Sequence, residues 1–176
     1  MKRLPFFIQP KPCQPAGFSL AELCVVLAIT AFGVGMALPS WQAWWWRVRV
    51  DSTVQAWAGD LQAARLQALR RGEFLQLQRL SHCLTTPLRA GDWRCGWQLV
   101  TKSATPSAAM LSSPLAGALG VQLYPALNSL DINPQGEAVA GGLRLVVQPM
   151  AAPALARSIC INITGRLRVV NGSTCT

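Results

Sequence analysis

The sequence predicts an α+β fold in which a long N-terminal helix packs on antiparallel β-sheets. Two observations lead to this prediction: apolar residues keep helical spacing as far as about residue 71, and beyond it they alternate with polar residues at every second position. One helix followed only by strands favours antiparallel pairing, because parallel strands need crossover helices between them. A length of 176 residues suits one such domain with an N-terminal anchor.

The anchor is predicted from an apolar run between Gly17 and Pro39. From Phe18 to Leu38 the only charged side chain is Glu22, and no proline interrupts the run. A helix of this length reaches roughly 30 Å, the thickness of the hydrocarbon core of a bilayer. A carboxylate inside hydrocarbon costs about 3 kcal/mol or more, so Glu22 is expected to have a specific charged partner.

Residues 17–22 place the motif Gly-Phe-Ser-Leu-Ala-Glu at the start of this run. The motif resembles the leader of type IV pilins and type II secretion pseudopilins. The resemblance implies that a prepilin peptidase cuts after Gly17, that Phe18 becomes the methylated N-terminus, and that Glu22 pairs with the N-terminal amine of a neighbouring subunit. Pro39 matches the position at which pilins commonly kink this helix. An amine and a carboxylate that neutralise each other cost less in lipid than either alone.

Two other interpretations of the N-terminus, a signal anchor and a secretory signal peptide, fit the residues less well. An uncleaved signal anchor would not need a glutamate in the apolar run. An ordinary secretory signal peptide has a shorter apolar core that ends in small residues.

The resemblance implies three segments. Residues 1–17 are the leader, residues 18–46 are a transmembrane helix that later forms the fibre core, and residues 47–176 are a globular pilin head whose amphipathic helix continues to about residue 72. It also implies insertion into the inner membrane with the N-terminus inside and the C-terminus outside, followed by a location in the periplasm and in a pilus at the cell surface. The implied partners are the inner membrane before assembly, prepilin peptidase, and other major and minor pilins.

The head is predicted to begin with an amphipathic helix that packs on the sheet. Its apolar residues recur at steps of three and four, which places them on one face of a helix. Two arginines and Gly72 end the helix, since cations favour the last turn and glycine the residue after it. Arg65 and Arg71 are expected to be solvated on the helix surface. The predicted stripe contains Val50, Val54, Trp57, Leu61, Ala64 and Ala68.

Half-buried strands are predicted wherever apolar and polar residues alternate after residue 72. Residues 133–136, Asn-Pro-Gln-Gly, form an expected turn, and residues 103–118 an expected mobile loop. The alternating positions are Leu75 and Leu77; Trp97 and Leu99; Val121 and Leu123; Leu143, Leu145 and Val147; and Ile159, Ile161 and Ile163. Residues 64–72, the Trp-x-x-Gly-Trp motif at 93–97 and the last strand resemble the GspH/FimT family of minor pilins, so the resemblance spans the mature chain.

Four of the six cysteines lie in the predicted head: Cys83, Cys95, Cys160 and Cys175. Outside the cytoplasm they are expected to be oxidised. Three pairings are possible, and Cys83–Cys95 with Cys160–Cys175 is favoured because each closes a short local loop. A zinc site that includes His82 is the alternative, but no Cys-x-x-Cys pair supports it. We therefore expect disulfides and no metal.

A basic motif near the C-terminus is the strongest candidate for a binding site. Residues two apart on a strand share a face, so Arg166 and Arg168 would project together while Leu167 faces the core. Gly165 would supply the turn before them, and Arg157 adds a further positive charge. Gly-Arg-x-Arg resembles the DNA-binding signature of FimT-type minor pilins, which implies that the chain binds extracellular double-stranded DNA for natural transformation. Such binding would be directed at the DNA backbone and independent of sequence.

Charge is compatible with this expectation but does not establish it. Loss of residues 1–17 would leave 13 basic and seven acidic residues, a net charge of +6, which favours a polyanionic partner. The alternative is that the two arginines form a solvated face or pair with a neighbouring pilin, and that the chain is a structural minor pilin or a GspH-like pseudopilin that primes or caps the fibre. One histidine, scattered acidic residues and no glycine-rich phosphate loop argue against an enzyme and against a cofactor.

Overall fold

The computed structural model describes residues 19–81, 83, 88–102, 109–115, 118–138, 140, 142–162 and 165–175, with the side chains of residues 34–40 left out. The predicted cleavage residues Gly17 and Phe18 and the predicted strand residue Ile163 lie outside this set. The chain divides into two compact units, residues 1–40 and residues 41–176. Each unit is described by itself.

Helix α1 (Leu20–Arg71) begins in the first unit. Ser19 accepts a hydrogen bond at its Oγ from the backbone N–H of Glu22, at 3.2 Å. Ser-x-x-Glu is the spacing of a capping box, in which the serine satisfies an N–H that the first helical turn leaves unpaired. Local capping chemistry therefore accounts for the start of the helix, and Glu22 takes part in it through its backbone N–H.

Within residues 19–33, the described part of the first unit that has side chains, the large apolar residues are exposed. Pro39 lies within the helical residues of α1, and its side chain is outside the described set. In the part of the chain that the structure describes, no helical stretch is both long enough and apolar enough to cross a membrane. The large exposed apolar residues are Leu20, Leu23, Val25, Val26, Leu27, Ile29 and Phe32.

In the second unit, α1 buries the predicted apolar stripe. All six stripe residues, from Val50 to Ala68, have exposed fractions of 1% or less. The helix ends at Arg71, and Gly72 follows it with a φ of +65°. The N–H of Gly72 donates to the carbonyl of Ala68 at 2.9 Å, which closes the last turn of the helix.

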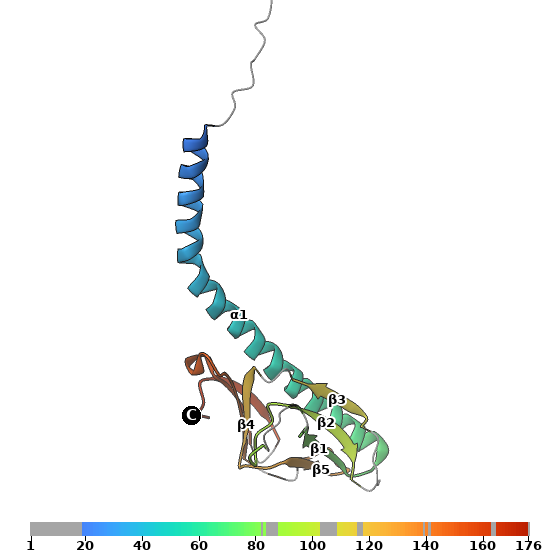
Figure 1. Cartoon of the computed structure of the whole chain (residues 1–176). Coiled ribbons are helices and arrows are strands. Elements are labelled where there is room, and N and C mark those ends of the chain that lie inside the picture. Colours follow the sequence, from blue (N-terminus) through green and yellow to red (C-terminus); the bar gives the residue numbers. More distant parts are fainter. Residues whose placement is uncertain are drawn as a thin grey trace, which may run out of the picture. The chain divides into compact units, whose positions relative to one another are not determined.

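In the described residues, eight strands form two four-stranded antiparallel sheets. The predicted α+β class is confirmed, with helix α1 ahead of the strands (Figure 1). Sheet A has the order β3-β2-β1-β5 and sheet B the order β4-β6-β7-β8. A 3₁₀ helix, η1 (Pro153–Leu155), lies between β6 and β7. The strands of sheet A are β1 (Leu75–Arg79), β2 (Gly96–Thr101), β3 (Leu111–Pro114) and β5 (Ser129–Ile132). The strands of sheet B are β4 (Leu119–Tyr124), β6 (Leu143–Pro149), β7 (Arg157–Ile161) and β8 (Leu167–Asn171).

One hydrophobic core joins the α1 stripe to the inner faces of both sheets. Trp57 from α1, Trp93 from the β1–β2 connection and Trp97 from β2 are its largest fully buried side chains. The core residues lie in residues 41–176. This unit therefore contains its own core and is suited to study as a separate fragment.

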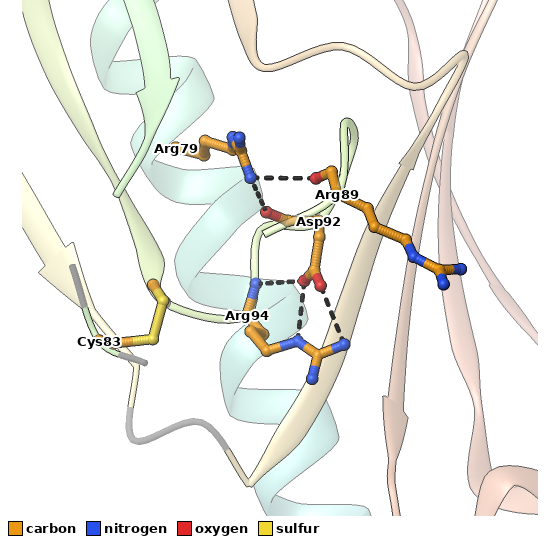
Figure 2. The surroundings of a disulfide bond; sticks show 6 residues. Arg79, Cys83, Arg89, Asp92 and Arg94 are labelled. Atoms are coloured by element: carbon orange, nitrogen blue, oxygen red, sulfur yellow. Dashed lines mark hydrogen bonds and ion pairs between the residues drawn. A yellow bond between two sulfur atoms is a disulfide. The ribbon is translucent and has the colours of Figure 1, made fainter. Parts of the chain in front are cut away.

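Residues 91–93 join the two sheets. The N–H of Trp93 donates to the carbonyl of Val121, and the N–H of Leu123 donates to the carbonyl of Gly91, both at 2.8 Å. Figure 2 shows Arg79 of β1 reaching the carbonyls of Arg89 and Asp92, close to the Cys83–Cys95 disulfide. The buried Asp92 carboxylate is held by the side chain and the N–H of Arg94 (Figure 2). Charged side chains thus fix the loop that couples sheet A to sheet B.

The prediction of a mobile loop at residues 103–118 is partly wrong, because Leu111–Pro114 form strand β3. This serine- and proline-containing segment lacks strand propensity, but it pairs with β2, and Ser113 donates from Oγ to the Asp60 carboxylate at 2.7 Å. The sequence also did not indicate β5, whose short apolar pattern becomes a strand by pairing with β1. Tertiary pairing overrode local preference in both cases.

Asp60 is predicted to stabilise the contact between α1 and sheet A. Besides Ser113, its carboxylate accepts the indole N–H of Trp97 at 2.7 Å, and Trp97 is fully buried. Asp60→Ala leaves that N–H without an acceptor, so it should lower the free energy of unfolding of residues 41–176 by about 1–3 kcal/mol in urea denaturation. Asp60→Asn, which keeps an acceptor, should lose less, and exposed Glu73→Ala should be neutral. Equal stability of Asp60→Ala and wild type would contradict this assignment.

Candidate nucleic-acid interface

The outer face of sheet B carries a row of four aligned residues. The antiparallel register pairs Tyr124 of β4 with Arg144 of β6, Arg144 with Cys160 of β7, and Cys160 with Arg168 of β8. Neighbouring residues on each strand, such as Leu143 and Leu145, are buried in the core. Because side chains alternate along a strand, the row faces away from the core.

An open groove lies along this row. Its volume is about 740 Å³, and its lining includes Tyr124 and three arginines: Arg144, Arg166 and Arg168. Arg166 and Arg168 are exposed, and Arg144 is half-buried. Among the described residues that line the groove, none is acidic. The predicted arginine pair is thus brought together with a third arginine in a concave, positively charged surface.

The Cys160–Cys175 disulfide forms part of the lining of the groove. Its Cα atoms are 5.9 Å apart, and both cysteines line the groove. The backbone of Gly172 exchanges hydrogen bonds with β7 and its approach: its N–H donates to Ala156 and its carbonyl accepts from Ser158 Oγ. The C-terminal residues are therefore tied to the outer face of sheet B beside the arginines.

A tight turn between β7 and β8 presents Arg166. The Asn162 side chain accepts from the N–H of Arg166 at 2.8 Å, and the N–H of Gly165 donates to the carbonyl of Asn162 at 2.9 Å. Gly165 has a φ of +78°, a conformation that residues with a Cβ rarely adopt. The glycine of the Gly-Arg-x-Arg motif is therefore explained by the turn that precedes the arginines.

Arg65 of α1 supports this turn from below. Its Nη1 donates to the carbonyl of Gly165 at 2.8 Å. A Cβ on Gly165 would lie 3.1 Å from Nη2 of Arg65, so the guanidinium packs directly against the glycine. Nε and Nη2 of Arg65 are buried without a hydrogen-bond partner among the described residues, and burial lowers the pKa of this guanidinium. The expectation that Arg65 is a solvated surface residue is wrong, since helix α1 and the turn meet only in the folded chain.

Arg157 does not belong to the groove. It faces α1, where its guanidinium pairs with Asp51, and its Nε donates to Asn171 at 3.0 Å. Its place at the start of β7 is at the opposite end of the β7–β8 hairpin from Gly165. The sequence placed Arg157 with the other arginines because they are close in the chain, but strand alternation turns it to the other face.

The acidic residues of the second unit are engaged elsewhere or lie outside the groove. Asp51 pairs with Arg157, Asp92 with Arg94, and Asp131 with Lys102. Burial alone would raise the pKa of Asp131, but hydrogen bonds from Lys102 and Gln76 outweigh it and lower the pKa. None of the three groove arginines forms an ion pair with an acidic side chain of the described residues. The groove thus keeps its positive charge available to a ligand.

Both disulfides have the pairings expected from the sequence, Cys83–Cys95 and Cys160–Cys175. Their thiols are therefore not available to zinc. Among the described residues no group of three histidine, cysteine, aspartate or glutamate side chains is placed to hold a metal ion. His82, the other residue considered for zinc, lies outside the described set.

Comparison with known families identifies the chain. A family model described as type II transport protein GspH matches residues 53–165, more than half of the sequence. The chain belongs to the GspH family. Members of this pilin family are structural proteins, so the chain is not an enzyme. A comparison with curated proteins found no match.

Solved structures similar to this GspH-family chain share its fold. The type IV minor pilin FimU of Pseudomonas aeruginosa, in space group P21, has a TM-score of 0.59 and 18% identity, over 74% of this chain and 94% of its own. The minor pseudopilin EpsH of the type 2 secretion system of Vibrio cholerae has a TM-score of 0.52 and 14% identity, over 69% of this chain and 96% of its own. At these identities the likeness shows the fold alone.

Gly165→Ala should destabilise this GspH-family protein by about 1–2 kcal/mol or more. A Cβ at this position meets both an unfavourable φ and the close Arg65 guanidinium. The measurement is urea denaturation of residues 41–176. Gly72→Ala is the matched control, since Gly72 also has a positive φ but no heavy atom within 4 Å of its Cβ position. A smaller loss for Gly165→Ala than for Gly72→Ala would contradict the close packing of Arg65 on the turn.

Proposed function

We propose that this GspH-family protein is a minor type IV pilin that binds extracellular double-stranded DNA through Arg166 and Arg168, for DNA uptake in natural transformation. The observation that supports it best is the groove on sheet B, where both arginines are exposed and have no acidic partner among the described residues. Guanidinium groups suit phosphate oxygens, because their N–H donors match the geometry of the two oxygens. The Gly-Arg-x-Arg motif at residues 165–168 adds the resemblance to FimT-type pilins.

Contacts to phosphates carry no base information, so the proposed binding is independent of sequence. It also weakens with salt, because each neutralised phosphate releases condensed counterions. The net charge of +6 expected after leader cleavage favours approach to a polyanion.

The proposed life history follows that of the pilin family. Prepilin peptidase cuts after Gly17, Phe18 becomes the N-terminus, and the helix of residues 18–46 holds the subunit in the inner membrane with its head outside. The subunit then joins other pilins in a fibre that reaches the periplasm and the cell surface, with Pro39 and Glu22 acting in assembly. The groove lies in the head, residues 47–176, and the ligand would bind there.

The first experiment measures binding of labelled duplex DNA to residues 41–176 by fluorescence anisotropy at several salt concentrations. Wild type should bind, and the log–log plot of affinity against salt should fall by about 0.9 for each phosphate contact. Replacing both Arg166 and Arg168 with Gln should abolish most binding and flatten this slope by about 1.8. The fold should stay intact, since both side chains are exposed.

The matched control replaces Arg70 and Arg71, two exposed arginines at the end of α1, with Gln. It removes the same charge from a surface outside the groove, so it should leave most of the affinity. If both double variants lost the same affinity for DNA, the loss would come from the net charge of the protein and not from the groove. No binding by the oxidised, folded wild type at low salt would contradict DNA binding.

A second candidate function is a purely structural one, in which the subunit primes or caps a pilus or a type II secretion pseudopilus. The description of the matching family model favours it, and so does the likeness in fold to a pseudopilin. The family match ends at residue 165, one residue before Arg166, so it has no bearing on the arginines. Both candidates require assembly into a fibre.

Glu22 offers a test of assembly. Its carboxylate would neutralise the N-terminal amine of a neighbouring subunit in the fibre, so Glu22→Ala in the full chain should spare leader cleavage but strongly reduce incorporation into fibres, measured by immunoblotting of sheared pili. Glu22→Gln separates charge from helix capping, because glutamine also suits the third helical position of a capping box. Gln should be as defective as Ala if charge is what matters. Normal incorporation of Glu22→Gln would contradict a role for the charge of Glu22 in assembly.

A further inference from the structure

We infer that Arg144, held on the ring of Tyr124, is a third phosphate contact of the groove on sheet B. This inference rests on the proposed binding of DNA and extends it to two residues that the C-terminal motif does not contain. The ligand chemistry is a phosphodiester backbone, and the experiment below distinguishes a duplex from a single strand as its source.

The position of Arg144 follows from the strand register. Arg144 and Arg168 lie on the same face of sheet B with one strand, β7, between them. Strands are spaced by about 4.8 Å, so the two Cα atoms are about 10 Å apart. That distance equals about three axial rises of 3.4 Å along a duplex, so Arg144 can reach a phosphate beyond those contacted by Arg166 and Arg168.

The surroundings of Arg144 leave its positive charge without an acidic partner among the described residues, so the charge is available to an anionic ligand. Its Cζ lies 4.6 Å from the centroid of the Tyr124 ring, and this is its only side-chain interaction among the described residues. Its Nε is buried there without a hydrogen-bond partner. Burying part of an arginine without an acidic partner costs free energy, and Arg157 and Arg94 each have such a partner. Arg144 instead lines a groove together with Arg166 and Arg168, which also have no acidic partner among the described residues.

Tyr124 acts as a positioning residue. Its hydroxyl donates to the Gln122 side chain at 2.6 Å, two residues along the same face of β4. The ring is therefore oriented by its own strand, and the cation–π contact holds the guanidinium of Arg144 against it. A ligand that binds a restrained guanidinium has less side-chain entropy to remove.

The test is anisotropy with a duplex and with a single strand of the same sequence, using residues 41–176 and a salt series. Arg144→Gln should weaken binding about tenfold and flatten the log–log salt slope by about 0.9 for a duplex or about 0.7 for a single strand. Arg49→Gln is the matched control: it removes the same charge from another arginine stacked on an aromatic ring, Trp45, outside the groove. It should leave the slope unchanged.

Substitutions of Tyr124 provide a second test, because they leave the charge of Arg144 and of the whole protein unchanged. Tyr124→Leu removes the ring and should weaken binding severalfold. Tyr124→Phe keeps the ring and loses only the hydrogen bond to Gln122, so it should bind more tightly than the Leu variant. Thermal unfolding of each variant checks the fold. If Arg144→Gln does not fold, this pair decides the question, and equal binding by the Leu and Phe variants would overturn the role of Tyr124.

The outcomes separate this inference from the proposed function. If wild type binds neither DNA, both fail. If wild type binds but Arg144→Gln behaves like Arg49→Gln, DNA binding stands and the assignment of Arg144 is overturned. A slope change seen with only one of the two DNA forms supports the contact and identifies that form as the source of the phosphates.

Discussion

Packing of the apolar stripe of α1 against both sheets is the interaction on which the rest of the second unit depends. Six helix residues, from Val50 to Ala68, are buried in one core with the inner faces of sheets A and B. Burial of a large aliphatic or aromatic side chain contributes about 1.5–3 kcal/mol, so this stripe and the strands that cover it dominate the stability of the head. Polar contacts at its edges, such as Asp60 with Trp97, then set how the helix lies on sheet A.

The same packing also determines which residues lie on the outer face of sheet B, where the groove is found. Once Leu143, Leu145 and Ile159 face the core, strand alternation turns Arg144 and Cys160 to the outer face. Antiparallel pairing then places Arg168 opposite Cys160, in the same row as Arg144, which lies 24 residues earlier in the chain. A cationic surface without acidic side chains is thus a consequence of the sheet order, and the Cys160–Cys175 disulfide anchors the C-terminal residues next to it.

Arg157 and Arg65 hold opposite ends of the β7–β8 hairpin against α1, and the fold gives each a different partner. Arg157 meets Asp51 of α1 and is neutralised in an ion pair that ties β7 to the helix. Arg65 meets a backbone carbonyl at the Gly165 turn and keeps two N–H groups without partners among the described residues. The first holds the hairpin at one end and the second at the other, so Arg166 and Arg168 are presented from a supported hairpin.

The sequence by itself determined what depends on local periodicity and on short-range chemistry. The helical stripe, the end of α1 at Gly72, six of the eight strands found in the described residues, the turn at residues 133–136 and both disulfide pairings could be predicted, because each is encoded within a few residues or in a short loop. Arg166 and Arg168 could be found from their motif. Only the tertiary structure decided that β3 and β5 are strands, that Arg144 joins the groove, that Arg65 lies under Gly165 and that Arg157 does not face a ligand. Those outcomes depend on strand order and on contacts between segments that are distant in the chain. Local sequence patterns do not specify which distant segments pair.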